Sequence, residues 1–277
     1  MLLVAGGQHD HNIGWLLRRV LARKIAFVDV INGPDLRPDL ALDLDDGTLR
    51  LDGKIIRPTG VFQRHDVFLD AYENKSEAQA AALNWFYFIR GWACANPAVR
   101  CLNRRSGTGE NNKIQNLIAA RDAGLRIPST RVQCLAPKKR GHIRKPVAGG
   151  ELTEMAGAAD PAERWRPYFH QPKLLRPELR VFVVDKRVFG CELKSENVDY
   201  RNDPHVRLAP AAVPRDVAKG LLRLCRALEL DFAAADFMRD AQGRLHFLEI
   251  NTQPMFVAFD KTLDGVISDA IIDYLTG

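Results

Sequence analysis

The 277-residue chain lacks the features that mark several classes of protein. It has no run of eighteen apolar residues, so the sequence predicts no transmembrane helix. The segment 1–7 indicates a buried strand and a turn, without the charged start and long apolar core of a signal peptide. The cysteines are odd in number, scattered and without a Cys-x-x-Cys pair, which favours reduced thiols over disulfides or zinc: Cys94, Cys101, Cys134, Cys191 and Cys225. We therefore expect a cytoplasmic protein without a membrane partner.

Common catalytic and nucleotide-binding signatures are missing as well. The Gly6-Gly7 turn is not a dinucleotide fingerprint, and no Walker-type phosphate loop occurs in the sequence. No Ser/His/Asp or Cys/His arrangement typical of nucleophilic catalysis can be identified. Internal repeats and low-complexity linkers are also absent from the sequence. If the chain binds a nucleotide, it has to hold it in another way.

The composition is that of an ordinary globular protein, with 46% apolar and 27% charged residues. The length allows two domains or one elaborate domain. The net charge of +6 is compatible with acidic partners, although an excess of this size commonly serves solubility alone.

Residues 1 to about 100 alternate between strand and helix signals. The sequence predicts strands at 2–4 and 26–31, and a helix between them that Asn12 caps. Asp-Gly turns separate short strands within 42–56. This alternation favours an α/β fold with an open sheet.

The rest of the chain carries further helix and hairpin signals. A helix is predicted at 111–122, with Ile114, Leu117 and Ile118 on its apolar face and Gly124 at its end. Another helix is predicted to start at Pro214. The predicted strands lie at 130–135, 141–150, 178–184 and 187–193, the last two joined around Asp185-Lys186.

The segment 232–251 carries the most informative pattern, two apolar strands joined by the turn 240–243. With a two-residue loop, Asp236 would face Phe247, and Glu249 and Asn251 would follow on the same face. Unpaired carboxylates are costly among apolar strands, and hard cations such as Mg²⁺ accept such oxygen ligands. A three-residue loop would invert the parity. The alternative is a pair of solvated carboxylates at a sheet edge.

The pattern Asp236-x12-Glu249-x-Asn251 resembles the magnesium site of ATP-grasp enzymes. These enzymes bind ATP between two α+β subdomains and mostly join a carboxylate to an amine through an acyl phosphate. Other segments resemble the same family in the same order. Asn112-Lys113 and 123–130 are similar to its first lysine segment, and Lys145 with Gly149-Gly150 to its second lysine strand and glycine loop. Taken singly, each lysine would be read as a surface residue.

The resemblance implies roles for further residues. Gln171 and Lys173 stand at the family's hinge, whose backbone groups contact adenine; the alternative is a plain turn at Pro172. Glu178-Leu179-Arg180 is similar to an acidic-x-Arg motif, with the acid toward ribose or substrate and the arginine toward the transferred phosphate or acyl group. The alternative is an ion pair at a strand edge. Lys194 and Arg201 follow where related ligases carry basic residues.

The resemblance also implies a domain organisation and a reaction. An α/β domain at 1–102 would precede an ATP-grasp core at 103–277, with a smaller lid-like part near 125–170. Asp236, Glu249 and Asn251 would hold Mg²⁺ or Mn²⁺, Lys113 and Lys145 would neutralise ATP phosphates, and Gly149-Gly150 would close over them. The implied enzyme is an ATP-dependent ligase that forms amide or ester bonds, with Arg180 and Lys194 as catalytic residues.

The layout looks most like the group of ribosomal-protein glutamate ligases and ribosomal-peptide maturases. The carboxylate substrate would then be an acidic peptide, or alternatively a small molecule. The loop Thr252-Gln253-Pro254 departs from the family's usual Asn-Pro continuation, which leaves the substrate open. A small-molecule kinase and an ATP-binding regulatory module stay as alternatives. A homo-oligomer is compatible with the sequence, and a nucleic-acid partner is not expected.

Three other features favour plainer interpretations. His9-Asp10-His11 fits no common zinc spacing and is read as a polar loop before a helix. The basic run 138–144 is read as a solvated face. The aromatic cluster at 85–92 is read as core or interface, because no basic stripe interleaves it.

Overall fold

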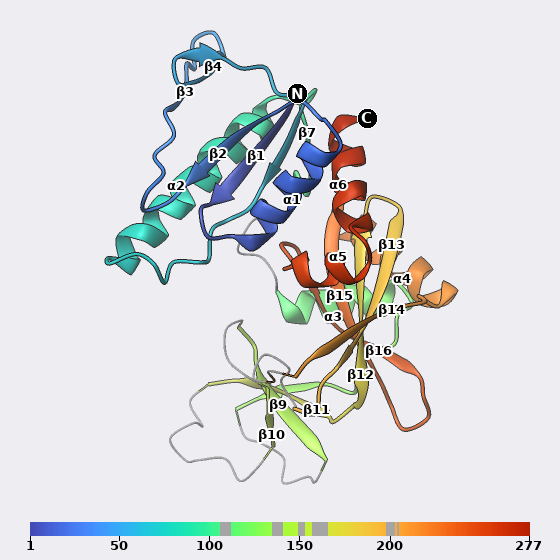
Figure 1. Cartoon of the computed structure of the whole chain (residues 1–277). Coiled ribbons are helices and arrows are strands. Elements are labelled where there is room, and N and C mark those ends of the chain that lie inside the picture. The colour runs from blue at the N-terminus through green and yellow to red at the C-terminus, as the bar shows by residue number, and fades with distance from the viewer. Residues whose placement is uncertain (106–111, 135–140, 149–152, 157–165, 198–202, 204) are drawn as a thin grey trace. The chain divides into compact units, whose positions relative to one another are not determined.

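The computed structural model describes residues 1–105, 112–134, 141–148, 153–156, 166–197, 203 and 205–277. The chain forms two compact units. Unit 1 comprises Met1–Thr108 and Met255–Gly277, and unit 2 comprises Gly109–Pro254. Each unit is coloured along the chain in Figure 1.

Unit 1 is built on a parallel sheet of four strands in the order β2-β1-β6-β7 (Figure 1). The strands are β1 (Leu2–Gly7), β2 (Phe27–Asn32), β6 (Gly60–Gln63) and β7 (Arg100–Cys101). A separate small antiparallel sheet contains β3 (Leu40–Leu42), β4 (Leu49–Leu51) and β5 (Lys54–Ile55). Strand β1 is buried along its whole length, because it pairs on both sides. The predicted open α/β sheet is confirmed.

Helix α2 (Lys75–Ala95) packs on one face of this sheet. Its buried side chains Ile89, Trp92 and Ala93 join Leu3 and Val61 in one hydrophobic core. Part of the predicted aromatic cluster is therefore core.

Helix α1 (His11–Ala22) lies beside α6 (Val266–Thr276), the last helix of the chain (Figure 1). The predicted cap of α1 was wrong by two residues. Asp10 is the N-cap, and its carboxylate accepts a hydrogen bond from the backbone N–H of Asn12 at 2.8 Å. Asn12 is buried, and its side-chain oxygen accepts from the backbone N–H groups of Phe256 and Val257. Asn12 thus fastens the C-terminal segment to unit 1.

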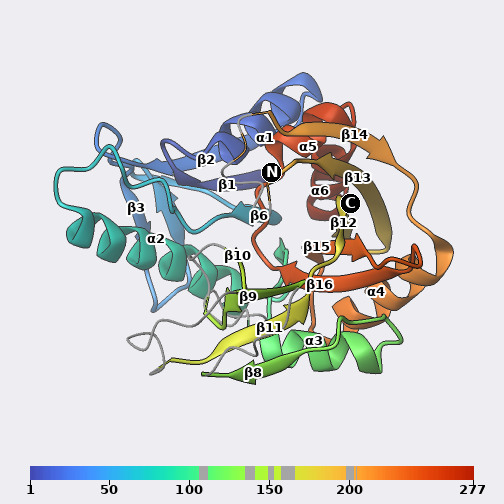
Figure 2. The ribbon, with the colours of Figure 1, turned by 90° about the horizontal axis from the view of Figure 1, so that it is seen from below.

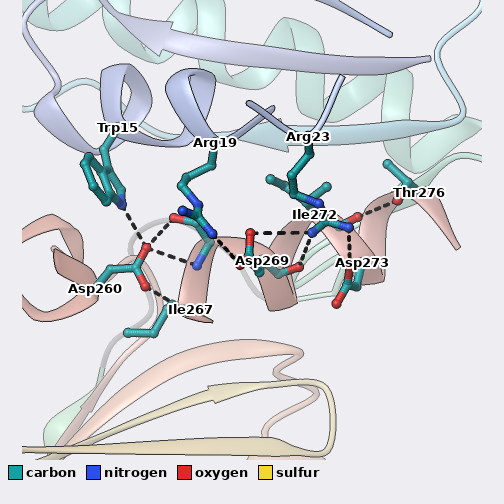
Figure 3. A network of polar contacts seen from close by, with 10 residues as sticks. Trp15, Arg19, Arg23, Asp260, Ile267, Asp269, Ile272, Asp273 and Thr276 are labelled. Atoms are coloured by element: carbon teal, nitrogen blue, oxygen red, sulfur yellow. Dashed lines mark hydrogen bonds and ion pairs between the residues drawn. The ribbon is translucent and has the colours of Figure 1, made fainter. Parts of the chain in front are cut away.

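A polar network continues this attachment along α1 (Figure 3). The Trp15 indole donates to Asp260 of α5 (Val257–Thr262) over 2.8 Å. Asp260 also accepts from the backbone N–H groups of Ile267 and Ser268. Further along, Arg19 pairs with Asp269, and Arg23 pairs with Asp273 at 2.7 Å. The segment 255–277 is therefore part of unit 1 although it follows unit 2 in sequence.

Unit 2 contains two antiparallel sheets. The larger has the strand order β14-β13-β12-β15-β16, and the smaller has the order β10-β9-β11-β8. The larger sheet is formed by β12 (Leu175–Val184), β13 (Arg187–Lys194), β14 (Arg207–Ala211), β15 (Phe232–Arg239) and β16 (Leu245–Asn251). The smaller is formed by β8 (Arg131–Gln133), β9 (His142–Pro146), β10 (Glu154–Met155) and β11 (Tyr168–Pro172). The predicted two-residue turn Asp185-Lys186 is confirmed, since Val184 pairs with Arg187.

Helices α3 (Lys113–Asp122) and α4 (Arg215–Ala227) lie side by side against the larger sheet (Figure 2). Pro214 is the N-cap of α4, and Gly124 takes a left-handed φ of 83° just after α3, both as predicted. The predicted apolar face of α3 was partly wrong. Leu117 is buried, but Ile114 and Ile118 are exposed, because buried Asn116 and Ala120 turn the buried stripe away from them.

Candidate active site

The larger sheet of unit 2 has two faces of different character. Alternate residues of β12 and β15, such as Val181 and Ala235, point to the helices and form a hydrophobic core with α3 and α4. The other face carries Glu178, Arg180 and Asp236, all buried and brought together by the register of β12 with β15. Polar side chains on a buried sheet face are costly unless they are paired or bind a ligand. This face is therefore the candidate site.

The β15–β16 hairpin reaches this arrangement by a register that differs from the predicted one. Asp236 pairs with Glu249, not with Phe247. The loop between Asp240 and Arg244 has three residues, which alone would invert the parity. A β-bulge at Leu248 adds one residue to β16 and restores it. Asp236, Glu249 and Asn251 consequently share one face, and Asn251 pairs with Ala234.

Asp236 is held by a two-pronged ion pair with Arg180. The Arg180 Nε donates to Oδ1 at 2.6 Å, and Nη2 donates to Oδ2 at 2.7 Å. Only 8% of the Arg180 side chain and 6% of the Asp236 side chain are exposed. Paired hydrogen bonds of this kind fix orientation as well as charge. The pair places a guanidinium at the centre of the candidate site.

Two lysines from different elements lie beside Glu249. Lys113 opens α3, and its Nζ lies 3.7 Å from Glu249 Oε2; Lys145 comes from β9 of the smaller sheet, and its Nζ lies at 3.8 Å. Burial alone would raise the pKa of Glu249, but the charges of Lys145 and Lys113 outweigh it and hold that pKa below its usual value. Burial lowers the pKa of Lys145, against the opposing charge of Glu249. The two lysines thus converge on one carboxylate.

Glu178 lies on the same face, two residues before Arg180. Its side chain is buried, and Arg176 Nη1 donates to its Oε2 at 3.2 Å. Burial, with the nearby charge of Asp236, raises the pKa of Glu178 to about 8. Arg176 was not among the predicted site residues, because it precedes the predicted strand 178–184 and β12 is irregular between Leu175 and Leu179.

The remaining predicted residues are placed less uniformly. Gln171 is buried, and its amide donates to the Thr130 hydroxyl at 2.8 Å, whereas Lys173 is exposed. Lys194 is not brought to the site. Cys191 is the cross-strand partner of Arg180 and shares its face of the sheet, whereas Lys194 lies on the opposite face of β13. There it pairs with Glu192 at 3.4 Å. Gly149, Gly150 and Arg201 lie outside the described residues.

The site residues fit a hard cation that is shared with phosphate oxygens. Asp236, Glu249 and Asn251 supply carboxylate and amide oxygens on one face, which is the donor set that Mg²⁺ prefers. Within the part of the chain that the structure describes, no three His, Cys, Asp or Glu side chains gather as a metal cage. Mg²⁺ is commonly bound through one or two carboxylates together with substrate phosphates, so such a cage is not required.

Comparison with known proteins defines the class of this fold. No protein-family profile and no curated protein sequence matches the chain. Solved structures do match it over nearly its whole length, and they show that the chain has the ATP-grasp fold. In the described part of the chain, no helix is long and apolar enough to cross a membrane.

Three of these structures illustrate the match. The ATP-grasp ligase PsnB, complexed with a phosphomimetic variant of its minimal precursor, Mg and ADP, has a TM-score of 0.79 and 22% identity over 99% of this chain and 98% of its own. The macrocyclase MdnC bound with precursor peptide MdnA, from Microcystis aeruginosa MRC, gives 0.74 and 18% over 100% and 99%. The VanG D-Ala:D-Ser ligase from Enterococcus faecalis gives 0.64 and 13% over 99% of both chains.

Proposed function

We propose that this protein is an ATP-dependent ligase that activates a carboxylate of a peptide as an acyl phosphate and transfers it to an amine or a hydroxyl. The observation that carries the proposal is the convergence of Lys113 and Lys145 on Glu249, beside Arg180 and Asp236. Two cations beside oxygen ligands for a metal are what a nucleotide polyphosphate requires.

In the proposed mechanism, the residues act by position and charge. Lys113 and Lys145 bind the phosphates of ATP, Glu249 and Asn251 hold the metal with Asp236, and Gly149-Gly150 cover the phosphate tail. Mg²⁺ held by these residues would supply neutralisation of phosphate charge. Arg180 contacts the oxygens of the transferred phosphoryl group with its guanidinium, while its Nε and Nη2 also hold Asp236. Glu178 contacts ribose or substrate, and Gln171 with Lys173 stands at the adenine.

The reaction needs no protein nucleophile. The substrate carboxylate attacks the γ-phosphorus, so that ADP leaves and an acyl phosphate forms on the substrate. The acceptor then attacks the acyl carbon and releases phosphate. Catalysis by orientation and preorganised charge accounts for a site made of lysines, an arginine and oxygen ligands.

A peptide is the favoured substrate class. PsnB and MdnC are described with precursor peptides, and both match this chain over nearly the whole length. The net charge of +6 would attract an acidic peptide. We propose Mg²⁺ as the working metal, with Mn²⁺ as a substitute that the same oxygen ligands accept.

The proposal is tested by trapping the acyl phosphate with hydroxylamine. The purified protein is incubated with ATP, Mg²⁺ and a panel of Glu-rich peptides, dipeptides and amino acids, and both ADP and hydroxamate are measured. We expect hydroxamate with at least one peptide, and a loss of roughly 100-fold or more in Glu249→Gln. Glu73→Gln, an exposed change in unit 1, is the matched control and keeps the activity.

Two results would contradict the proposal. ADP together with a stable phosphorylated product and no hydroxamate would indicate a kinase. Equal hydroxamate formation by Glu249→Gln and the wild type would show that the site lies elsewhere.

A further inference from the structure

Unit 1 has a second polar site, at the carboxyl ends of its central strands. The sheet order β2-β1-β6-β7 means that the chain leaves β1 toward β2 on one side, while β6 lies on the other. The loops after β1 and β6 therefore diverge. In open α/β sheets, a crevice forms outside the strand ends at such a point, and ligands bind there.

Buried polar atoms without a hydrogen-bond partner occur in several segments at this edge. Among the described residues, none forms a hydrogen bond with Asp66 Oδ2, Gln63 Oε1 or His9 Nε2, although all three atoms are shielded from solvent. They come from the end of β6, the loop after it and the loop after β1. Buried polar atoms are nearly always satisfied by protein, water or a ligand, so each of these atoms needs a partner.

Asp66 is the centre of the group. Asp66 is only 3% exposed. Its second carboxylate oxygen, Oδ1, accepts a hydrogen bond from the Phe68 backbone N–H at 2.9 Å. The carboxylate lies directly over Gly7: a Cβ at Gly7 would stand 2.0 Å from the Asp66 Cγ. The glycine at the end of β1 therefore makes room for the carboxylate, which is turned toward the strand end.

Asp66 forms no ion pair among the described residues, whereas the neighbouring carboxylate does. The neighbouring Asp10 is already paired with Arg64 at 2.6 Å, and 3% or less of either side chain is exposed. Burial raises the pKa of the Asp66 carboxyl, and the nearby His65 and His9 act against this rise. Tyr72 is near as well, since burial and the charge of Asp66 raise the pKa of its hydroxyl.

The chemistry of the free atoms selects the ligand. Asp66 Oδ2 and Gln63 Oε1 are acceptors only, and the His9 ring nitrogen Nε2 is an acceptor in one tautomer of the imidazole. A primary ammonium carries three N–H donors and one positive charge, and so matches this set.

We propose that the strand-end site of Asp66, Gln63 and His9 binds a primary ammonium group of the lysine side-chain type. The site lies within unit 1 and needs no nucleotide, so the inference is independent of the proposed ligase function. It also gives a role to Gly7 and to the His9-Asp10-His11 loop, which sequence reasoning left without a ligand.

The test is ligand-observed NMR with the full chain in the absence of ATP. The probe is Nα-acetyl-lysine methylamide, and its Nε-acetylated form is the uncharged control. We expect the wild type to bind the charged probe and not the acetylated one. Asp66→Asn should weaken binding roughly tenfold or more, because it removes a charge-assisted hydrogen bond. Asp29→Asn, an exposed change on β2, should bind like the wild type.

If Asp66→Asn does not fold, His9→Ala serves as the second variant and should weaken binding measurably. The proposal is overturned if the wild type binds neither probe, in which case water fills the site. It is also overturned if both probes bind equally, or if Glu249→Gln rather than Asp66→Asn abolishes binding.

Discussion

At the scale of single residues, the candidate active site is an electrostatic arrangement in which each charge is buried or half-buried beside an opposite one. Arg180 faces Asp236, and the two lysines face Glu249. Ionised groups lose much of their hydration in such a position, so each group depends on the opposite charge beside it. The consequences can be measured on the pairs separately.

The Arg180–Asp236 pair should show strong coupling in folding stability. Arg180→Met leaves the Asp236 carboxylate buried without its cation and should lower the free energy of unfolding by about 3–5 kcal/mol. The double variant Arg180→Met/Asp236→Leu removes both charges and should recover most of that loss. Urea denaturation at neutral pH measures both. A single variant as stable as the wild type would contradict the buried pairing.

Glu178 should make stability depend on pH. Its pKa is raised from 4.5 to about 8, so between these values the folded state binds a proton that the unfolded state has lost. Stability should therefore fall as pH rises from about 5 to 8, by at most about 1.4 kcal/mol per pH unit. Glu178→Gln should flatten this part of the profile. Denaturation midpoints in EDTA from pH 5 to 9 provide the comparison, and parallel profiles for the two proteins would refute the assignment.

At the scale of secondary structure elements, the sequence predicted more of the fold than of the register. Hydrophobic periodicity, proline and glycine located α4, the end of α3 and the turn at Asp185-Lys186. The predicted register of the β15–β16 hairpin was wrong, because the hairpin has a three-residue loop and a bulge at Leu248, whose effects on the parity cancel. A bulge depends on packing against neighbouring strands, which a single strand's residues do not reveal. Asn12 was likewise assigned to a cap, since its true contacts lie about 244 positions away.

Helix α3 should position Lys113 through its N-cap. The Asn112 side chain accepts from the backbone N–H groups of Ile114 and Gln115, at 3.0 and 3.1 Å. Asn112→Ala should destabilise unit 2 by about 1 kcal/mol and raise the KM for ATP, because the first turn of α3 frays. Asn112→Asp keeps the cap and should restore both. Thermal unfolding and steady-state ATP kinetics are the measurements; an unchanged KM in Asn112→Ala would separate the cap from nucleotide binding.

At the scale of the whole molecule, the chain passes from unit 1 into unit 2 and returns. Residues 255–277 complete unit 1, through Asn12, Asp260 and the arginine pairs of α1. The sequence-based division at residue 102 placed 103–277 in one core, because the local pattern of the last residues does not reveal which sheet they cover.

Asp260 should contribute much of the stability of the contacts that hold residues 255–277 in unit 1. It is fully buried, and its carboxylate accepts from Trp15, Ile267 and Ser268. Asp260→Ala leaves several buried donors unsatisfied and should cost roughly 3 kcal/mol or more of stability. Exposed Asp29→Ala is the control and should change stability by less than about 0.5 kcal/mol. Equal unfolding midpoints for the two variants would show that the network contributes little.

Isotope transfer from the substrate carboxylate tests directly whether the carboxylate is activated as an acyl phosphate. The peptide that responds in the hydroxylamine assay is labelled with ¹⁸O in its carboxyl groups and incubated with ATP, Mg²⁺ and its acceptor. Activation through an acyl phosphate predicts one ¹⁸O atom in the released inorganic phosphate for each bond formed. Product formation with phosphate that carries no label would contradict the account.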